Sequence, residues 1–284
     1  MREIYTAVMA EPNDPADRPA ESEAPVRLGG MAMRNGILVQ SLDHWAAAVR
    51  TDGGEIRVAS GRKPELPAWA LAVPGMRGVA RVAEAVYLLP LVKRRLPEAR
   101  LPIEGPTAAG AMAASVVLGR ALRSSRLRPL PAELLGAGIS LAPALISLRG
   151  SRLAGYHGAE HKAIGAYEQG TEDVDATKEH ERCGSHLVGP LLAATAAGNL
   201  AVNRLPAARR GPARLAVGVA AIGVATETFG WMQRHRGNIF SRILSRPGYE
   251  LQRVAGTREP SADELAVARA ALDAVLDLEG RSRP

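Results

Sequence analysis

The residues best suited to chemistry lie between positions 156 and 186 of the 284-residue chain. His157 and His161 stand four residues apart, so on a helix their imidazoles share one face and can reach one metal ion. With Glu160 they form His-x-x-Glu-His, a pattern in which two histidines bind zinc and the glutamate acts as a base. The same stretch also holds two further histidines and the only cysteine of the chain: His180, His186 and Cys183.

Other side chains are candidates to complete the coordination shell. At about 100° per residue, Glu168 returns to the face of the two histidines. Gly158 indicates tight packing of this helix, and Gly170 is expected to end it. His180 and Cys183 also have metal-ligand spacing, and a thiolate or imidazole there would complete a four-ligand zinc site. Glu227 interrupts an apolar run, where a carboxylate is costly and indicates a functional site. We therefore predict a divalent-metal site, with zinc as the expected ion and these candidate ligands: His157, His161, Glu168, His180, Cys183 and Glu227.

Each of these positions also has a purely structural interpretation. Paired histidines on a helix can be surface residues or hydrogen-bonded core residues. Glu227 can equally face a polar cavity or pair with an arginine near the end of its helix. The pattern alone leaves these alternatives open.

Four apolar runs decide the fold class. Each has about the length of the shorter membrane-spanning helices, which need roughly 17–25 residues, and each is flanked by arginines. Their many alanines and glycines fit equally well a soluble bundle of closely packed helices. The runs are Thr107–Leu122, Leu134–Leu148, Leu187–Val202 and Leu215–Met232.

The segments before the apolar runs differ in character. Residues 1–27 are rich in proline and acidic residues, which predicts a disordered tail without the apolar core of a signal peptide. Residues 28–66 predict a small β unit of two or three strands, with a small-residue turn at Gly29-Gly30-Met31-Ala32-Met33 and a hairpin turn at Asp52-Gly53-Gly54. An amphipathic helix that ends at Pro90 and the basic cluster Lys93-Arg94-Arg95 is expected to lie on a partner or on a membrane surface.

The predicted helical domain covers residues 67–246, and a C-terminal extension covers 247–284. Ser261 and Glu264 form a capping box that begins the last helix. This helix presents one apolar face, so we expect it to dock on another element. The face consists of Leu265, Ala268, Leu272, Val275 and Leu276.

The charge pattern favours a membrane over a nucleic acid. The net charge is +7, but the arginines stand at the ends of apolar runs rather than on one face. Such arginines are typical of positions next to anionic lipid. No DNA- or RNA-binding motif is present, so we predict membrane lipid and a metal ion as partners and no nucleic acid. The single cysteine excludes an internal disulfide framework.

Several motifs together resemble the YqhQ-like family of bacterial proteins of unknown function, which are described as predicted metal-dependent, multi-pass membrane proteins. The resemblance spans about Leu28 to Leu276 and implies a membrane protein with His157, Glu160, His161, Glu168 and Cys183 at its centre. It supplies no substrate. In one departure, Asn35 stands where the family usually has an acidic residue, so any role of that acid is absent here. The motifs are Gly29-Gly30-x-Ala32, Pro74-Gly75-Met76-Arg77-Gly78, Tyr156-His157-Gly158-Ala159-Glu160-His161-Lys162, Tyr167-Glu168-x-Gly170, Arg182-Cys183-Gly184-Ser185, Leu251-Gln252-Arg253 and Thr257-Arg258-Glu259-Pro260.

The predicted fold is mainly α: a membrane-embedded bundle of about four apolar helices, with a small N-terminal β hairpin unit and a C-terminal amphipathic helix. The predicted function is that of a metal-dependent hydrolase in which Glu160 is the base acting on a metal-bound water. A first alternative is a non-enzymatic scaffold or assembly protein, whose structural metal is bound by His157, His161, His180 and Cys183. A second alternative is a transporter with Glu227 in the ion path.

The predicted location is the inner membrane of the cell, crossed several times. Basic residues flank the apolar runs on both sides, so the positive-inside rule hardly discriminates between the two orientations of the chain in the membrane. The lack of a signal peptide and the polar N-terminal unit favour cytoplasmic termini. Four spans would then place the loop with the histidines and Cys183 on the cytoplasmic side as well.

Overall fold

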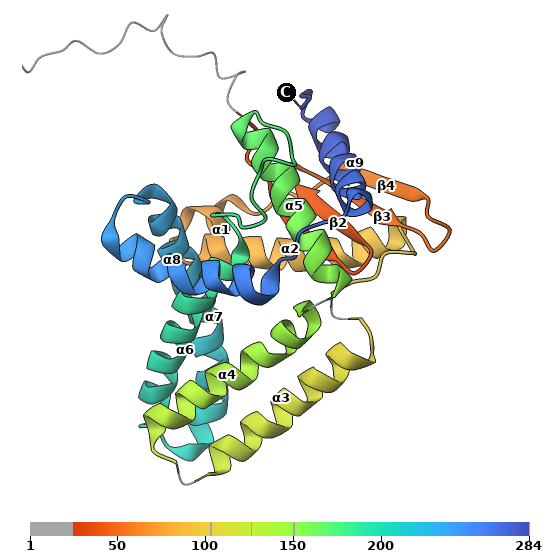
Figure 1. Cartoon of the computed structure of the whole chain (residues 1–284). Helices are drawn as coiled ribbons and strands as arrows, with labels where there is room; N and C mark the ends of the chain where they lie inside the picture. The colour runs from red at the N-terminus through yellow and green to blue at the C-terminus, as the bar shows by residue number, and fades with distance from the viewer. Residues whose placement is uncertain (1–24, 103, 126, 150, 284) are drawn as a thin grey trace, which may run out of the picture.

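The computed structural model of the chain describes residues 25–102, 104–125, 127–149 and 151–283, without the side chains of 107, 123, 129 and 134. The tail predicted for residues 1–27 lies outside these ranges except for its last three residues. Mainly helical structure follows a small N-terminal sheet (Figure 1). The predicted fold class is confirmed.

The sheet contains four antiparallel strands in the order β1-β2-β3-β4, whereas two or three were predicted. The turn predicted at residues 52–54 connects the last two strands, and Gly54 adopts a φ of +85° there. The additional strand is the segment Gly29–Met33. We expected a turn there, because glycine and alanine have low strand propensity. Pairing along its whole length with the next strand overrides that propensity. The strands are β1 (Gly29–Met33), β2 (Gly36–Gln40), β3 (His44–Arg50) and β4 (Ile56–Arg62).

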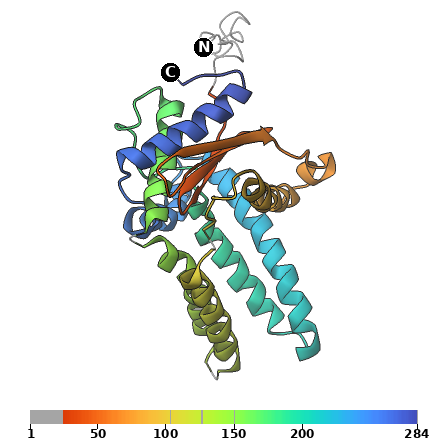
Figure 2. The same ribbon diagram turned by 90° about the vertical axis from the view of Figure 1, so that its right-hand side faces the viewer.

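Both faces of the sheet are covered by helices. Figure 2 shows α5 (Arg152–Gln169) and α9 (Ala262–Leu278) on one side and α2 (Met76–Arg95) on the other. Because side chains alternate along a strand, β2 and β3 contribute to two separate cores. Ile37, Val39, Ala46 and Ala48 join the α5 and α9 side, and Leu38, Trp45, Ala47 and Val49 join the α2 side.

Helix α2 continues through Pro90 and ends at Arg95, within the basic cluster that the sequence also placed at its end. A proline inside a helix removes one hydrogen bond and crowds the preceding turn. Leu88 and Val92, on either side of it, are fully buried against the sheet, and their burial favours continuation of the helix. Three basic residues in the last turn also complement the helix dipole.

The last helix docks as predicted. Ser261 and Glu264 form both hydrogen bonds of the capping box at the start of α9. The five predicted apolar residues of α9 are all buried, with at most 8% of each exposed, in the core that α9 shares with the sheet and α5. The C-terminal helix therefore helps to hold the helix that carries His157 and His161.

Two helix pairs extend away from the sheet in the same general direction (Figures 1 and 2). One pair is α3 (Pro106–Ser124) with α4 (Pro129–Leu148), and the other is α6 (Val188–Val202) with α7 (Ala207–Arg234). The short α1 (Ala68–Ala72) packs against α2, and α8 (Ile239–Leu251) lies beside the sheet-proximal ends of the second pair.

Within the part of the chain that is described, three helices are long and apolar enough to cross a membrane: Leu130–Leu148, Gly184–Val202 and Ala207–Arg234. Ala108–Leu122 is a shorter apolar helix. Only 0%, 17% and 22% of the apolar windows of the three long helices are buried within the protein. The remaining apolar surface faces outward, as expected when lipid rather than protein covers it.

Small residues allow the helices to approach closely. A Cβ atom on Gly198 of α6 would lie 2.5 Å from Val217 of α7. A Cβ atom on Gly78 of α2 would lie 1.7 Å from the Thr226 hydroxyl of α7. Small residues at such positions let two helices approach more closely than larger side chains would.

Candidate metal centre

Helix α5 positions the two histidines of the His-x-x-Glu-His motif. It begins at Ser151, whose side chain accepts a hydrogen bond from the Ala154 N–H, and it ends as predicted at Gly170, where φ is +65°. From Leu153 to Tyr167 every residue except His157 is buried. Neighbouring elements on several sides therefore fix the rotation of the helix.

The segment from Thr257 to Pro260 crosses α5 at a glycine. A Cβ atom on Gly158 would lie 2.2 Å from the Arg258 carbonyl oxygen, so only glycine permits this approach. The Arg258 N–H donates to the Ala154 carbonyl at 2.9 Å, and Lys162 pairs with Glu259 at 2.5 Å. The tight contact predicted at Gly158 is confirmed.

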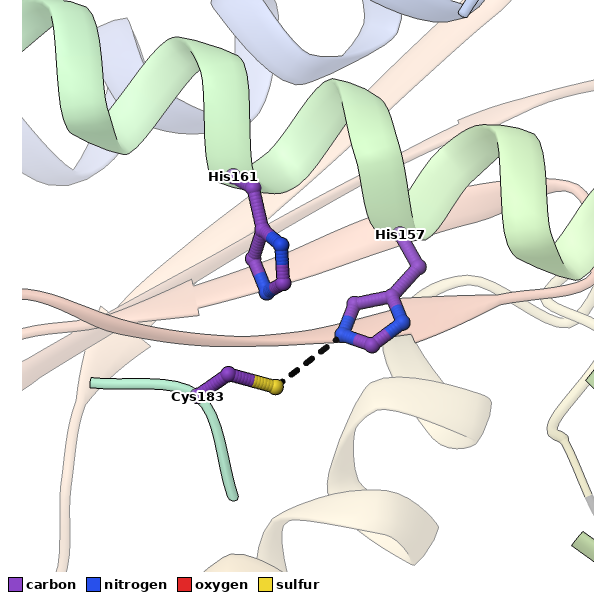
Figure 3. Close-up of side chains that lie close together, drawn as sticks. All are labelled: His157, His161 and Cys183. Carbon is purple, nitrogen blue, oxygen red and sulfur yellow. Dashed lines mark hydrogen bonds between the residues drawn. The ribbon is translucent and has the colours of Figure 1, made fainter. Parts of the chain in front are cut away.

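His157, His161 and Cys183 form a compact group. One nitrogen from each ring and the Cys183 sulfur all lie within 4.8 Å of one another. The ring centroids of the two histidines are 4.3 Å apart, and Cys183 Sγ lies 3.4 Å from His157 Nε2. Figure 3 shows both rings on the side of α5 that faces Cys183, which lies on a separate segment. The three side chains could hold a metal ion.

Backbone carbonyls orient both imidazoles. His157 Nδ1 lies 2.8 Å from the Gly256 carbonyl oxygen, and His161 Nδ1 lies 2.7 Å from the Lys178 carbonyl oxygen. A carbonyl can only accept, so each Nδ1 carries the proton and each Nε2 presents a lone pair. Metal-binding histidines typically have such an outer hydrogen bond. Both carbonyl groups belong to segments outside α5, so the His-x-x-Glu-His motif alone could not predict these two hydrogen bonds.

Gln252 holds the segment that carries Cys183. Its side chain is completely buried. Its carbonyl oxygen accepts from the His180 N–H at 2.8 Å, and its amide nitrogen donates to the His180 carbonyl at 3.2 Å and to Ser185 Oγ at 2.8 Å. Gln252 therefore fixes the backbone on both sides of Cys183. In the sequence, Gln252 stood out only as part of the motif Leu251-Gln252-Arg253, which contributes to the family resemblance.

His180 and Glu168 lie beside the compact group and contact each other. His180 Nε2 is 3.3 Å from a Glu168 carboxylate oxygen, and His180 Nδ1 accepts from the Arg182 N–H at 3.3 Å. Glu168 also pairs with the Arg182 side chain. Both ring nitrogens of His180 thus have protein partners, and direct ligation by His180 or Glu168 stays a prediction.

Glu227 has a different environment from the one that the sequence favoured. Its carboxylate accepts from the Gly75 N–H at 2.9 Å and from Arg77 Nε at 2.7 Å. It thereby joins the first turn of α2 to α7. The arginine partner, left open as an alternative by the sequence, accounts for this carboxylate. Its predicted ligation receives no support from these contacts.

Glu160 lines a cavity of about 670 Å³ together with His157, His161 and Cys183. Its side chain is buried. Burial raises the pKa of Glu160 to about 8, a rise that the nearby His157 partly opposes. A carboxyl group with a pKa near neutrality is suited to proton transfer.

Burial also acts on two members of the compact group. It lowers the pKa of His161 well below its ordinary value, which keeps this imidazole neutral and its lone pair free. It raises the pKa of the Cys183 thiol. A bound cation would oppose this rise, because metal coordination deprotonates a thiol.

A glycine of the first strand makes room for the Glu160 carboxyl group. A Cβ atom on Gly30 would lie 2.4 Å from Glu160 Oε1 and 2.5 Å from Glu160 Cδ. At the adjacent Gly29, nothing lies within 4 Å of the corresponding position. The sequence predicted a turn here, and nothing local linked Gly30 to Glu160, which lies 130 residues further along the chain.

Comparisons with known proteins give a family description without an activity. Residues 145–278 match a family model described as "Protein of unknown function (DUF1385)". The matched region contains the compact group, Glu160 and Gln252 but not the sheet. No curated protein and no solved structure matches the chain significantly. The match supports the predicted resemblance to an uncharacterised family.

Proposed function

We propose that this chain is a membrane-bound, zinc-dependent hydrolase. The observation that carries the proposal is the convergence of two oriented imidazole nitrogens and one thiol sulfur, with the Glu160 carboxyl group in the same cavity. Zinc accepts this nitrogen and sulfur donor set. Three protein ligands leave a fourth tetrahedral position open, which is typical of catalytic rather than structural zinc sites.

A bound zinc ion would supply Lewis acidity, lowering the pKa of a water molecule and polarising a carbonyl group. Its positive charge would also favour the ionised form of Glu160. Glu160 would then accept a proton as water oxygen bonds to the carbonyl carbon. It would donate that proton to the leaving amine or alcohol as the C–N or C–O bond breaks. The products are a carboxylic acid and that amine or alcohol.

The two other predicted functions receive less support. A closed structural site would need a fourth protein ligand, and both ring nitrogens of His180 already contact other groups. An ion path through Glu227 would need an available carboxylate, and this carboxylate is paired with Arg77. We therefore favour the open site.

The three long apolar helices support a location in the membrane. We propose the inner membrane of the cell, with the shorter Ala108–Leu122 helix and its neighbour in the first pair embedded together. An even number of spans places both termini on one side, and we propose the cytoplasmic side. The compact group then lies near the level where the helix pairs meet the sheet.

Removal and return of the metal tests the hydrolase proposal. Detergent-purified protein is treated with dipicolinate, dialysed and reloaded with zinc, and hydrolysis of 4-nitrophenyl octanoate is followed by absorbance. We expect hydrolysis to disappear with zinc and to return with it. A Cys183→Ala variant serves as the control, because it should not recover. Equal hydrolysis before and after zinc removal would contradict the proposal.

A pair of glycine substitutions tests the placement of Glu160. Gly30→Ala is expected to lower the hydrolysis rate on the order of ten-fold or more, because the new methyl group displaces the carboxyl group of the base. Gly29→Ala is the matched control on the same strand, since open space surrounds its added methyl group. Zinc content should stay the same in both variants. Equal rates in both would show that the Gly30 contact does not position Glu160.

A further inference from the structure

The cavity beside the compact group has two chemically different walls. One wall comes from α5 and the segment from His180 to Ser185 and contains the polar groups already described. The other comes from β1 with its preceding residue, from α3 and from α4, and it is mainly apolar. Its polar members are few, notably Ser140 and Ser147 of α4. Its apolar members are Leu28, Met31, Ala32, Ala108, Met112, Pro143, Ala144 and Leu148.

The apolar wall continues into a helix that is suited to lipid. Most of α4 belongs to the apolar stretch Leu130–Leu148, of which 0% of the window is buried within the protein. On α3, Met112 lines the cavity, while Val116, one turn further along, is exposed. A molecule dissolved in the bilayer would therefore meet the cavity along α3 and α4 without crossing a polar barrier.

We infer that the site binds an amphiphile with one long hydrocarbon chain, taken from the bilayer, with the chain against α3 and α4 and the carbonyl group at His157, His161 and Cys183. The reaction at that carbonyl rests on the proposed hydrolase function, whereas binding of the chain does not. A cavity of about 670 Å³ is large enough for such a ligand, since small-molecule sites span about 300–1,000 Å³.

The wall is poorly suited to a peptide. Each residue of an extended peptide carries an N–H and a C=O group, and these lose free energy when buried without partners. The α3 and α4 side of the cavity offers mainly methyl and methylene groups. A hydrocarbon chain has no such groups, so it can move from the bilayer to this wall without leaving buried polar groups unpaired.

Photolabelling in nanodiscs tests this inference without requiring turnover. The probe is dodecanoic acid with a diazirine near its methyl end, in phosphatidylcholine nanodiscs, and labelled residues are located by mass spectrometry. We expect labelling at Met112, Ala144 and Leu148. Ala144→Trp, which fills the wall, should lower this labelling on the order of ten-fold. Leu135→Trp is the matched control on the exposed part of the same helix and should leave the labelling unchanged.

The outcomes separate binding from chemistry. Cavity labelling that Ala144→Trp removes supports the inference, even if wild-type protein hydrolyses no ester; in that case only the hydrolase proposal fails. Labelling confined to outward-facing residues of α6 and α7 overturns the inference, because it would report bulk lipid. Equal labelling in the Ala144→Trp and Leu135→Trp variants also overturns it. Zinc-dependent hydrolysis that persists without cavity labelling leaves the hydrolase proposal intact.

Discussion

Replacement of His161 by alanine is expected to remove zinc from the protein. His161 is buried, and its Nδ1 hydrogen bond to the Lys178 carbonyl holds Nε2 toward His157 and Cys183. Loss of an outer-sphere partner typically lowers metal affinity 10–100-fold, so loss of one of only three ligands should lower it on the order of 100-fold or more. Elemental analysis after gel filtration in chelator-free buffer measures the zinc that remains per chain.

His235→Ala provides the control for this experiment. His235 follows the end of α7 and is exposed. Its Nδ1 lies 2.9 Å from the Trp231 carbonyl oxygen in the last turn of the same helix. Its removal should leave the zinc content unchanged. If zinc remains in the His161→Ala variant while the protein stays folded, the assignment of His161 as a ligand is wrong.

Glu160→Gln is expected to abolish turnover while zinc stays bound. Glutamine has nearly the same shape and fits beside Gly30, but its amide cannot accept and return a proton. General acid–base catalysis typically contributes about 10²–10⁴-fold in rate, which corresponds to about 3–5 kcal/mol of transition-state stabilisation. The measurement is the rate of ester hydrolysis by the zinc-loaded variant, with its zinc content determined on the same sample.

The matched control is Glu172→Gln, which removes an exposed carboxylate just beyond the end of α5. This variant should retain both zinc and turnover. A Glu160→Gln protein that keeps its zinc and hydrolyses at the wild-type rate would exclude Glu160 as the base. Loss of zinc in this variant would instead indicate that the carboxylate is a ligand.

Local patterns predicted the parts of the molecule that depend on short-range chemistry. The spacing of His157 and His161 placed both rings on one face of a helix, and Gly170 ended that helix. The capping box at Ser261 and the apolar face behind it predicted a docked helix. Run lengths and composition predicted helices apolar enough for a membrane. In each case, residues within a few turns of one another determine the outcome.

The remaining features depend on contacts between residues that are distant in sequence. The Gly30 contact with Glu160 and the Arg77 pair of Glu227 each join segments from different parts of the chain. The same holds for Gly256, whose carbonyl orients His157. Pro90 illustrates a related limit. A proline usually ends or kinks a helix, but burial of Leu88 and Val92 in the core beside the sheet keeps α2 helical through Pro90. A single sequence carries no direct signal for such pairs.

The most direct test of a three-ligand zinc centre is X-ray absorption at the zinc edge of the wild-type protein, combined with its metal content. We expect about one zinc ion per chain, with one sulfur at about 2.3 Å and two imidazole nitrogens at about 2.0–2.1 Å. We also expect a light, non-imidazole scatterer in the fourth position. Protein without zinc, or a zinc shell lacking sulfur, would contradict the three-ligand zinc centre. A third imidazole in the shell would indicate the closed, structural site instead.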